Sequence, residues 1–501
     1  MSARRRDVVV VGAGPAGLQA ALAARALGAS VTLLDASDEL GGQYWRHLPA
    51  SRPSAAEASL HHGFERFLAI RAALDADAGC TVVTEAQVWA IDVDRDAPAD
   101  DTTATGLRLH VLVGPPDGAD RTPLTLRPDA LVLATGAHDR TLPFPGWDLP
   151  GVFSAGAAQA LAKGERVAVG QRVVVAGAGP FLLPVAASLT ATGSRVLGVY
   201  EATTVGGLAA GWLPKPWQLL GVTGKVGELI GYVGGHLRHR IPYRVGHAVV
   251  AAHGTERVER VTIAAVDADW SPIPGTERTV EADAVCVSHG FTPRLELAIA
   301  AGCALTPTRF VEVDAEQRTS VPTVFAAGEI TGIGGVDAAL AEGAIAGHAA
   351  AGGLPGASGI RSAVSRRDTF LAFTDRLERA HGIREGWSDW LEDDTTICRC
   401  EEVDHGALRG TATATCATGL RSLKLSTRAG LGICQGRMCG RTVEELLHRV
   451  ARESGGDGLI DGVSSDRRPI ASPIRIGELA AHGPEPAPHE PTSTPSTEPL
   501  G

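Results

Sequence analysis

The chain has 501 residues with an apolar content of 44%, so it is long enough to bury the cores of several domains. Its formal net charge of −11 argues against a nucleic-acid-binding surface, because phosphate neutralisation needs clustered Lys and Arg that this sequence lacks. The eight cysteines do not form an extracellular disulfide pattern, since four are scattered singly and four gather near the C-terminus.

The N-terminus imitates a secretory signal, because three arginines, Arg4–Arg6, precede an apolar run. The same segment contains the glycines of a nucleotide-binding turn, which cleavage would destroy. We therefore expect a mature N-terminus and a cytoplasmic location. No stretch of about twenty apolar residues predicts a transmembrane helix.

The first predicted unit is a strand, a glycine-rich turn, a helix and a second strand. The apolar run Asp7–Val11 leads into the turn, the stretch Leu18–Leu27 is helical in character, and Ser30–Leu34 forms the second strand. Asp35 ends that strand, where a carboxylate can hydrogen-bond a ribose hydroxyl. This order predicts a βαβ nucleotide-binding unit.

The turn itself reads Gly12-x-Gly14-x-x-Gly17. The first glycine makes the tight turn, the second allows backbone to approach a pyrophosphate, and the third brings helix against strand. The glycine spacing alone also occurs by chance at Ala-rich helix starts, so Asp35 and the preceding strand are what favour a nucleotide site.

A second unit of the same kind follows at Arg172–Ala176, with Gly177 and Gly179 in its turn and Ser194–Glu201 as its second strand. Leu182 replaces the third glycine, and this larger side chain argues against close packing of the helix on the strand. The acid Glu201 ends the second strand, where a carboxylate favours the free 2′-hydroxyl of NAD over the 2′-phosphate of NADP. NAD(H), another nucleotide and a vestigial pocket all remain open for this site.

The late cysteines form two pairs, Cys398-x-Cys400 and Cys434-x4-Cys439. Four thiolates suit a [2Fe-2S] cluster or structural zinc, and unliganded thiols are a third alternative. One intervening residue is unusual for zinc, and glycines around the second pair leave amides available to the cluster, so the cluster is favoured. We expect Cys416 to be a buried small residue.

Further motifs add a resemblance. The segments Gly41-Gly42-Gln43, Leu131–Gly136 and Val324–Glu329 stand in the order typical of two-dinucleotide-domain flavoproteins, and the chain resembles the pyridine nucleotide-disulfide oxidoreductase superfamily. The alternative is that these segments are simply turns. The resemblance implies FAD at the first site, with Glu329 where the family usually has Asp, and it implies these FAD-binding residues: Gly12, Gly14, Pro15, Ala16, Gly17, Asp35, Gly42, Gln43, Arg46, Thr135, Gly136, Gly328 and Glu329.

Disulfide reductases of that superfamily place a cysteine pair beside the flavin. Here the segment after Gly42 reads Gln43-Tyr44-Trp45-Arg46, without cysteine. Dithiol chemistry is therefore not expected.

The resulting fold prediction is α/β, with two Rossmann-like dinucleotide-binding domains and a small C-terminal [2Fe-2S] domain. The predicted bounds are 1–150 and 295–355 for a discontinuous FAD domain, 151–294 for the second Rossmann-like domain, 365–455 for the cluster domain and 456–501 for an irregular to disordered tail.

The cysteine block is similar to the BFD-like [2Fe-2S] domain, and the whole chain resembles the FAD-binding alpha-type subunits of bacterial opine oxidases, D-hydroxyproline or proline dehydrogenases and hydrogen cyanide synthase. The resemblance implies a D-amino-acid-oxidase-type flavoprotein partner that oxidises a small-molecule amine, together with a small ferredoxin-like subunit. This chain would accept and pass electrons through FAD and the cluster.

No residue announces itself as catalytic. His138 and His289 lie near the nucleotide units but are expected in loop or core roles, and Arg140, like Arg46, is a candidate phosphate contact. Two other functions stay open: a stand-alone NAD(P)H-dependent flavin reductase, and a noncatalytic iron-sulfur regulatory protein.

Overall fold

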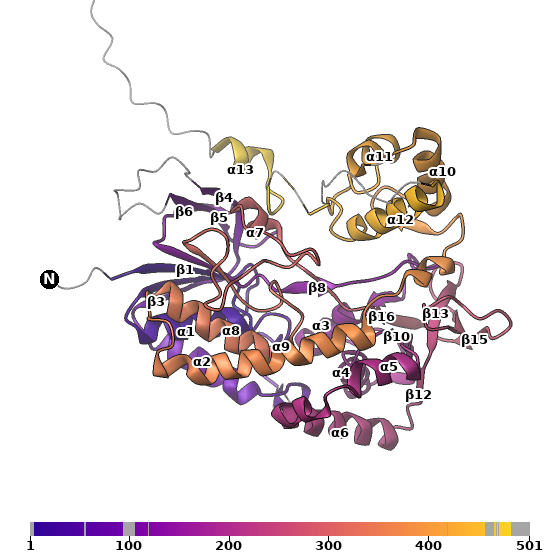
Figure 1. Ribbon diagram of the computed structural model, residues 1–501, viewed down its shortest axis with the longest axis horizontal. Coiled ribbons are helices and arrows are strands. Elements are labelled where there is room, and N and C mark those ends of the chain that lie inside the picture. Colours follow the sequence, from indigo (N-terminus) through magenta and orange to yellow (C-terminus); the bar gives the residue numbers. More distant parts are fainter. Residues whose placement is uncertain are drawn as a thin grey trace, which may run out of the picture.

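The computed structural model describes residues 5–54, 57–93, 106–118, 120–417, 419–455, 465–466, 468 and 470–481. Two α/β halves lie side by side, and a small helical block, α10 to α12, lies against one end (Figure 1). None of the described helices combines the length and apolarity needed to cross a bilayer.

The first half is built on a five-stranded sheet whose four pairings are all parallel. Its order is β18 (Val324–Ala326), β7 (Ala130–Leu133), β1 (Asp7–Val11), β2 (Ser30–Leu34) and β3 (Cys80–Val83). Because β18 returns to this sheet after the whole second half, the domain is discontinuous, which confirms the predicted fold class.

Helices cover one face of this sheet and a β-meander covers the other. On the helical face, glycines of α8 approach the backbone of α1 so closely that a methyl group at Gly343 or Gly347 would overlap the carbonyl oxygens of Ala16 and Ala20. The elements of the two faces are α1 (Pro15–Ala26), α2 (Phe64–Asp75) and α8 (Gly335–Ala350), then β4 (Ala86–Val93), β5 (Leu107–Val113) and β6 (Thr122–Leu126).

The second half repeats the plan. Its sheet runs β12 (Tyr243–Val245), β11 (Arg195–Glu201), β10 (Arg172–Gly177), β16 (Ala284–Ser288) and β9 (Val152–Ser154), again all parallel. The helices α3 (Ala155–Gly164) and α4 (Leu182–Ala191) pack on one face. On the other face lies the antiparallel sheet of β13 (His247–His253), β14 (Arg260–Ala265) and β15 (Arg278–Glu281).

Both βαβ units therefore form where the apolar runs predict them. The sequence did not predict the helical insertion between β11 and β12, which holds α5 (Val205–Trp212), the 3-10 helix η2 (Pro216–Val222) and α6 (Thr223–Arg238). The first helix begins at Pro15 rather than Leu18, because proline at the first helical position has no amide to lose and a suitable fixed φ.

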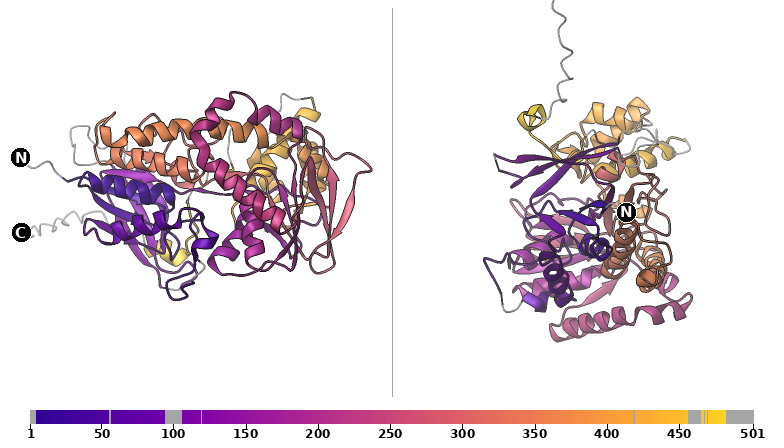
Figure 2. Two further views of the ribbon diagram at one scale, coloured as in Figure 1. Left: turned by 90° about the horizontal axis from the view of Figure 1, so that it is seen from below. Right: turned by 90° about the vertical axis from the view of Figure 1, so that its left-hand side faces the viewer.

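Three connections join the halves. Strand β8 (Ala137–Asp139) pairs antiparallel with β17 (Phe291–Pro293), and the short helix α7 (Glu296–Ala300) follows. The long helix α9 (Arg361–His381) packs on α8 near its start and on α5 near its end (Figure 2). The 3-10 helix η1 (Glu57–Leu60) lies between β2 and α2, η3 (Ser358–Ile360) precedes α9 and η4 (Glu385–Trp390) follows it.

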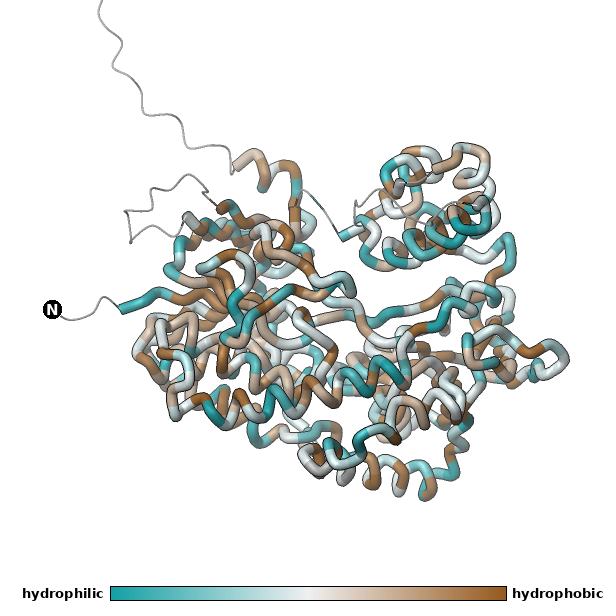
Figure 3. Tube along the Cα trace, in the orientation of Figure 1, coloured by the Kyte–Doolittle hydropathy of each residue, from teal (hydrophilic) through white to brown (hydrophobic). Residues whose placement is uncertain are grey.

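The C-terminal block contains β19 (Thr396–Cys398), β20 (Val403–Asp404), α10 (His405–Thr415), α11 (Leu420–Thr427) and α12 (Gly440–Glu453). Hydropathy alternates along α12 (Figure 3), and its buried residues Val443, Leu446 and Leu447 join the core of the second half. A further helix, α13 (Ile476–Ala481), lies beside the β-meander, where Glu478 forms an ion pair with Arg121 at 2.5 Å. The predicted disorder from 483 onward falls outside the described residues.

Candidate functional sites

The first glycine turn is shaped by two positions that admit no side chain. Gly12 has a φ of +101°, and a methyl group on it would overlap the carbonyl oxygen of Ala134. A methyl group on Gly17 would overlap the carbonyl oxygen of Gly12, so this glycine sets the approach of helix to strand. These two glycines build the turn and do not themselves define a ligand.

Gly14 differs from them. Its φ of −73° suits any residue, and a methyl group there would meet no atom closer than the Cα of Gly42, 4.0 Å away. Gly14 is the N-cap of α1, and no described side chain caps the amides of that helix start. We therefore predict that an anionic pyrophosphate binds in the space in front of Gly14, at the positive end of the helix.

A second turn faces this space. Gly42 has a φ of +58°, and a methyl group on it would lie 2.9 Å from the Cα of Gly14. Close approach of the two backbones thus requires glycine at position 42, whereas position 14 has room for a side chain. Just after it, the Nε of Arg46 donates to the Oε1 of Gln43 at 3.1 Å. Gly42 therefore lies beside the first turn, whereas Arg46 contacts Gln43 and the end of α3 at Gly164.

Asp35 is held at the end of β2 by two backbone amides. Its Oδ2 accepts from the amide of Ala13 at 2.6 Å and its Oδ1 accepts from the amide of Ser37 at 2.8 Å. The carboxylate lies against the glycine turn, as the βαβ pattern predicts. The hydrogen bond to a ribose stays a prediction.

The remaining predicted residues come from β7 and β18. Gly328 has a φ of +82°, and a methyl group on it would lie 2.9 Å from the Cβ of Ala16, which places it over the first turn of α1. The Oε1 of Glu329 accepts from the amide of Gly335 at 2.9 Å, so this carboxylate is held at the start of α8. Thr135, which precedes Gly136, donates to the carbonyl of Arg294 at 2.8 Å.

Sequence reasoning missed a third carboxylate at this site. Glu342 lies inside α8 with 4% of its surface exposed, and its Oε2 accepts from the amide of Gly328 and the hydroxyl of Thr331, both at 2.7 Å. Burial raises the pKa of Glu342 to about 7, although these hydrogen bonds lower it. The signal in the sequence was an acid in the interior of an otherwise Ala- and Gly-rich helix, beyond the Asp337 of its first turn.

Glu342 makes stability depend on pH. A carboxyl whose folded pKa is raised stabilises the fold fully below its unfolded pKa near 4.5, and this contribution is lost as pH rises through about 7. We expect Glu342→Gln to reduce the loss of unfolding free energy between pH 5 and 8 by about 2 to 3 kcal/mol. Urea titrations of the flavin-free chain at both pH values measure it.

The matched control is Glu312→Gln at an exposed position, for which the same pH dependence as in the wild type is expected. A Glu342→Gln chain with an unchanged pH dependence would contradict the assignment. Burial also raises the pKa of Glu329 to about 7. Glu329 is therefore expected to keep some pH dependence of the unfolding free energy in both the wild type and the Glu342→Gln chain.

The second glycine turn forms but is closed by the protein itself. Gly177 has a φ of +139° and packs against the carbonyl of Ser288, and Gly179 has a φ of +100°. Leu182, which replaces the third glycine, is fully buried at the start of α4 and belongs to the core with Val173. The leucine is therefore accommodated as a core residue rather than beside a ligand.

Glu201 faces protein groups instead of an open ribose site. It is fully buried and accepts from the amide of Gly179 at 3.0 Å, the hydroxyl of Tyr243 at 2.8 Å and the ring of His381 at 3.1 Å. Burial raises the pKa of Glu201, but His381 and the other two donors outweigh it and hold the pKa below its usual value. The end of α9 also contacts α5, where Gly211 packs on Ala380.

The four late cysteines gather in space. The thiols of Cys398 and Cys439 are hydrogen-bonding neighbours, and so are those of Cys400 and Cys434. The amide of Gly430 donates to the Sγ of Cys398 at 3.5 Å. The hydrogen bond with Cys439, together with bonds from backbone amides, outweighs burial and lowers the pKa of Cys398 to about 6.

This arrangement fits a cluster better than one ion. In the described part of the chain, no three His, Cys, Asp or Glu side chains converge as ligands of one metal ion would. A [2Fe-2S] cluster divides four thiolates between two irons, so two neighbouring pairs fit it. Cys416 differs from expectation: it is exposed and ends α10 in the left-handed conformation.

The cysteine block docks on β8. The ring of His138 lies 3.3 Å from the carbonyl oxygen of Arg437, between Cys434 and Cys439. Arg140 is buried and donates to Thr442 at 3.1 Å and Glu445 at 2.8 Å. Arg140 is therefore a domain contact and not the candidate phosphate ligand that we expected.

His289 has the core role that we expected. It is buried between the rings of Trp270 and Trp390, and burial lowers its pKa to about 3. It is therefore neutral at physiological pH.

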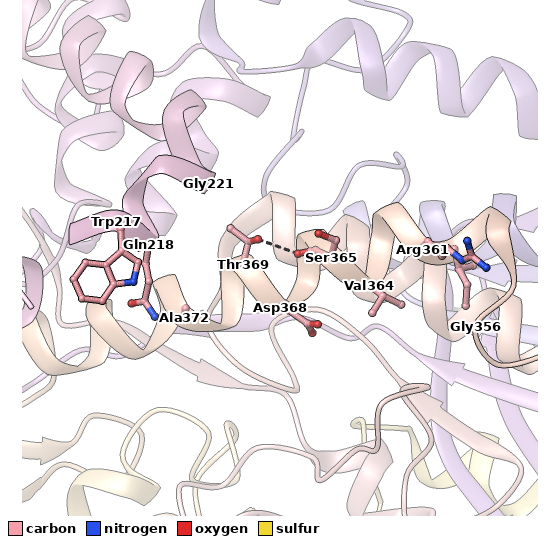
Figure 4. A pocket seen from close by; sticks show the side chains of 11 residues that line it. Trp217, Gln218, Gly221, Gly356, Arg361, Val364, Ser365, Asp368, Thr369 and Ala372 are labelled. Atoms are coloured by element: carbon pink, nitrogen blue, oxygen red, sulfur yellow. Dashed lines mark hydrogen bonds between the residues drawn. The ribbon is translucent and has the colours of Figure 1, made fainter. Parts of the chain in front are cut away.

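A cavity of about 740 Å³ lies elsewhere, between η2 and α9. Trp217 and Gln218 line one side and the α9 residues Arg361, Asp368 and Thr369 line the other (Figure 4). None of its lining residues belongs to the glycine turns or the cysteine block, so we assign no cofactor to it.

Comparison with known families matches both sites. The model of the pyridine nucleotide-disulphide oxidoreductases matches residues 6–343, and that of the BFD-like [2Fe-2S] binding domain matches residues 396–449. The second match supports a [2Fe-2S] cluster over zinc at the four cysteines.

Relatives are similar over nearly the whole chain. Hydrogen cyanide synthase subunit HcnB of Pseudomonas protegens is 32% identical over 89% of this chain and 93% of its own length. An opine oxidase subunit of Agrobacterium tumefaciens is 31% identical over 95% of this chain and 91% of its own length. The structure of L-proline dehydrogenase from P. horikoshii, at 20% identity and a TM-score of 0.61, covers 95% of this chain and 79% of its own, and shares the fold.

Proposed function

The chain belongs to the pyridine nucleotide-disulphide oxidoreductase family and is an FAD and [2Fe-2S] oxidoreductase subunit, and from this premise we propose that it transfers electrons in a multisubunit dehydrogenase of an amine or imino acid. Both relatives are named as subunits of larger enzymes, and each is similar over about nine tenths of its length. The opine part of the proposed substrate class follows the name of the second relative, and the hydroxyproline part follows the resemblance described in the sequence analysis.

One contact, between β8 and the cysteine block, supports the proposed electron-transfer role. The Thr135-Gly136 segment of the first site continues directly into β8, whose His138 reaches the carbonyl of Arg437 between two of the cluster cysteines. FAD supplies two-electron chemistry when bound, and the cluster supplies one-electron steps. The segment that follows the first site contacts the cysteine block, through His138 to Arg437 and through Arg140 to Thr442 and Glu445, and these contacts support the proposal.

The partners follow from the same proposal. A D-amino-acid-oxidase-type flavoprotein subunit would oxidise the amine, and a small ferredoxin-like subunit would join the complex. Affinity purification of the tagged chain from its native host is expected to recover the flavoprotein subunit. The recovered complex is expected to reduce an artificial acceptor when an opine, hydroxyproline or proline is supplied. A fully active chain that purifies alone would contradict this.

The closed second site argues against a stand-alone NAD(P)H-dependent flavin reductase. Glu201 is already occupied by Gly179, Tyr243 and His381, so a nicotinamide dinucleotide would have to break these contacts. We expect NADH and NADPH to leave the flavin absorbance of the anaerobic chain unchanged, whereas dithionite bleaches it. Bleaching within seconds by NADH would favour the reductase. A chain that retains iron but binds flavin poorly and does not turn over would favour the iron-sulfur regulatory alternative.

A further inference from the structure

Lys163 is a buried cation without an acidic partner. It lies in the last turn of α3 with 7% of its surface exposed. Its Nζ donates to the carbonyl of Tyr44 at 3.2 Å and lies 5.7 Å from the centroid of that ring. In the described part of the chain, no carboxylate lies within ion-pair distance of it. One hydrogen bond leaves two of the three ammonium protons without a protein acceptor.

The surroundings do not compensate this charge. The nearby carboxylate of Glu57 is already engaged by Arg166 and by His61 at 3.0 Å. Burial lowers the pKa of Lys163 to about 8, and the charge of Lys163 contributes to lowering the pKa of His61. An uncompensated buried ammonium is costly, so a ligand that brings negative charge would offset the cost.

The position of Lys163 identifies that ligand. Tyr44 follows Gly42, which faces the pyrophosphate space at Gly14, by two residues. Tyr44 is also close enough to Asp337, near the start of α8, to feel its charge. The resemblance to disulfide reductases implies that the segment Gln43–Arg46, which directly follows Gly42, lies beside the flavin. Lys163 therefore borders the flavin end of the first site rather than its adenosine end.

We propose that Lys163 is the residue that stabilises the negative charge gained by the isoalloxazine ring on reduction, a role that rests on FAD binding at the first site. An ammonium beside that ring favours the reduced flavin over the oxidised one. Removing the charge is expected to weaken this preference about tenfold, which lowers the two-electron midpoint potential by about 30 mV.

The test uses the full FAD-loaded chain with Lys163→Met, Lys163→Arg and, as a surface control, Lys215→Met at an exposed position. Spectroelectrochemical titration gives the flavin potential, and thermal unfolding of the flavin-free chains gives stability. Lys163→Met is expected to lower the potential and to raise the unfolding temperature of the flavin-free chain, because it removes a buried charge. Lys163→Arg is expected to restore most of the potential, and the control to match the wild type.

Two outcomes overturn the proposal. An unchanged potential in Lys163→Met would show that the ammonium does not act on the flavin. A Lys163→Met chain that is less stable without flavin and has a wild-type potential would show a structural role. A wild-type chain that binds no FAD would instead overturn the function proposed above, and flavin absorbance of the purified wild type detects that case separately.

Discussion

A chain with Gly14→Val is expected to fold but to contain no FAD. The φ of −73° at Gly14 is allowed for valine, and no protein atom lies within 4 Å of the added Cβ except the Cα of Gly42 at that limit. The valine would instead fill the space in front of the α1 amides, where the pyrophosphate binds. We expect the affinity for FAD to fall by more than about a hundredfold. Each tenfold loss corresponds to about 1.4 kcal/mol of binding free energy.

Flavin absorbance after purification and far-ultraviolet circular dichroism measure the two halves of this expectation. Gly224→Ala is the matched control, because Gly224 lies in α6 with open space around it. This variant chain is expected to retain flavin and to be slightly more stable, since alanine favours a helix more than glycine does. Gly17→Ala, which would overlap the carbonyl of Gly12, is expected to misfold instead. A folded Gly14→Val chain with a full complement of FAD would refute the first site.

The second large effect concerns the cluster. Cys398→Ser is expected to lower the iron content from about two per chain to near zero, because serine is a poor ligand for a [2Fe-2S] cluster. FAD content is expected to stay the same, since the glycine turns lie in a different domain. Iron analysis, electron paramagnetic resonance of the reduced chain and flavin absorbance give these quantities.

Cys416→Ser provides the control for that experiment. Its thiol is exposed at the end of α10, so its loss is expected to leave iron and flavin unchanged. Equal loss of iron in both variants would remove the case for Cys398 as a ligand. Zinc in place of iron in the anaerobically purified wild type would overturn the cluster itself.

Local sequence was sufficient for much of the fold. The apolar runs before Gly12 and Gly177 predicted both βαβ units, because buried parallel strands are apolar on both faces and the turns after them need glycine. The cysteine spacing predicted a site of four thiolates, and the thiols neighbour one another in two pairs, while their joint role as cluster ligands stays a prediction. These features depend on residues that are close in the sequence or on a strict ligand chemistry.

What sequence reasoning missed depends on distant partners. Glu201 resembled a ribose ligand, yet its donors Tyr243 and His381 lie 42 and 180 positions away. Glu342 is explained by Gly328 and Thr331, which only the return of the chain to the first sheet brings near. Arg140 likewise pairs with a residue 305 positions later. No local pattern contains such pairings, because tertiary packing creates them.

The late return of β18 and α8 to the first sheet has a consequence for synthesis on the ribosome. Strand β7 keeps an unpaired edge until β18 has emerged, and α1 exposes its Ala-rich face until Gly343 and Gly347 arrive to pack on it. The nascent chain therefore carries its glycine turn through the translation of the entire second half before that turn is walled in. Flavin incorporation is expected to follow translation of α8.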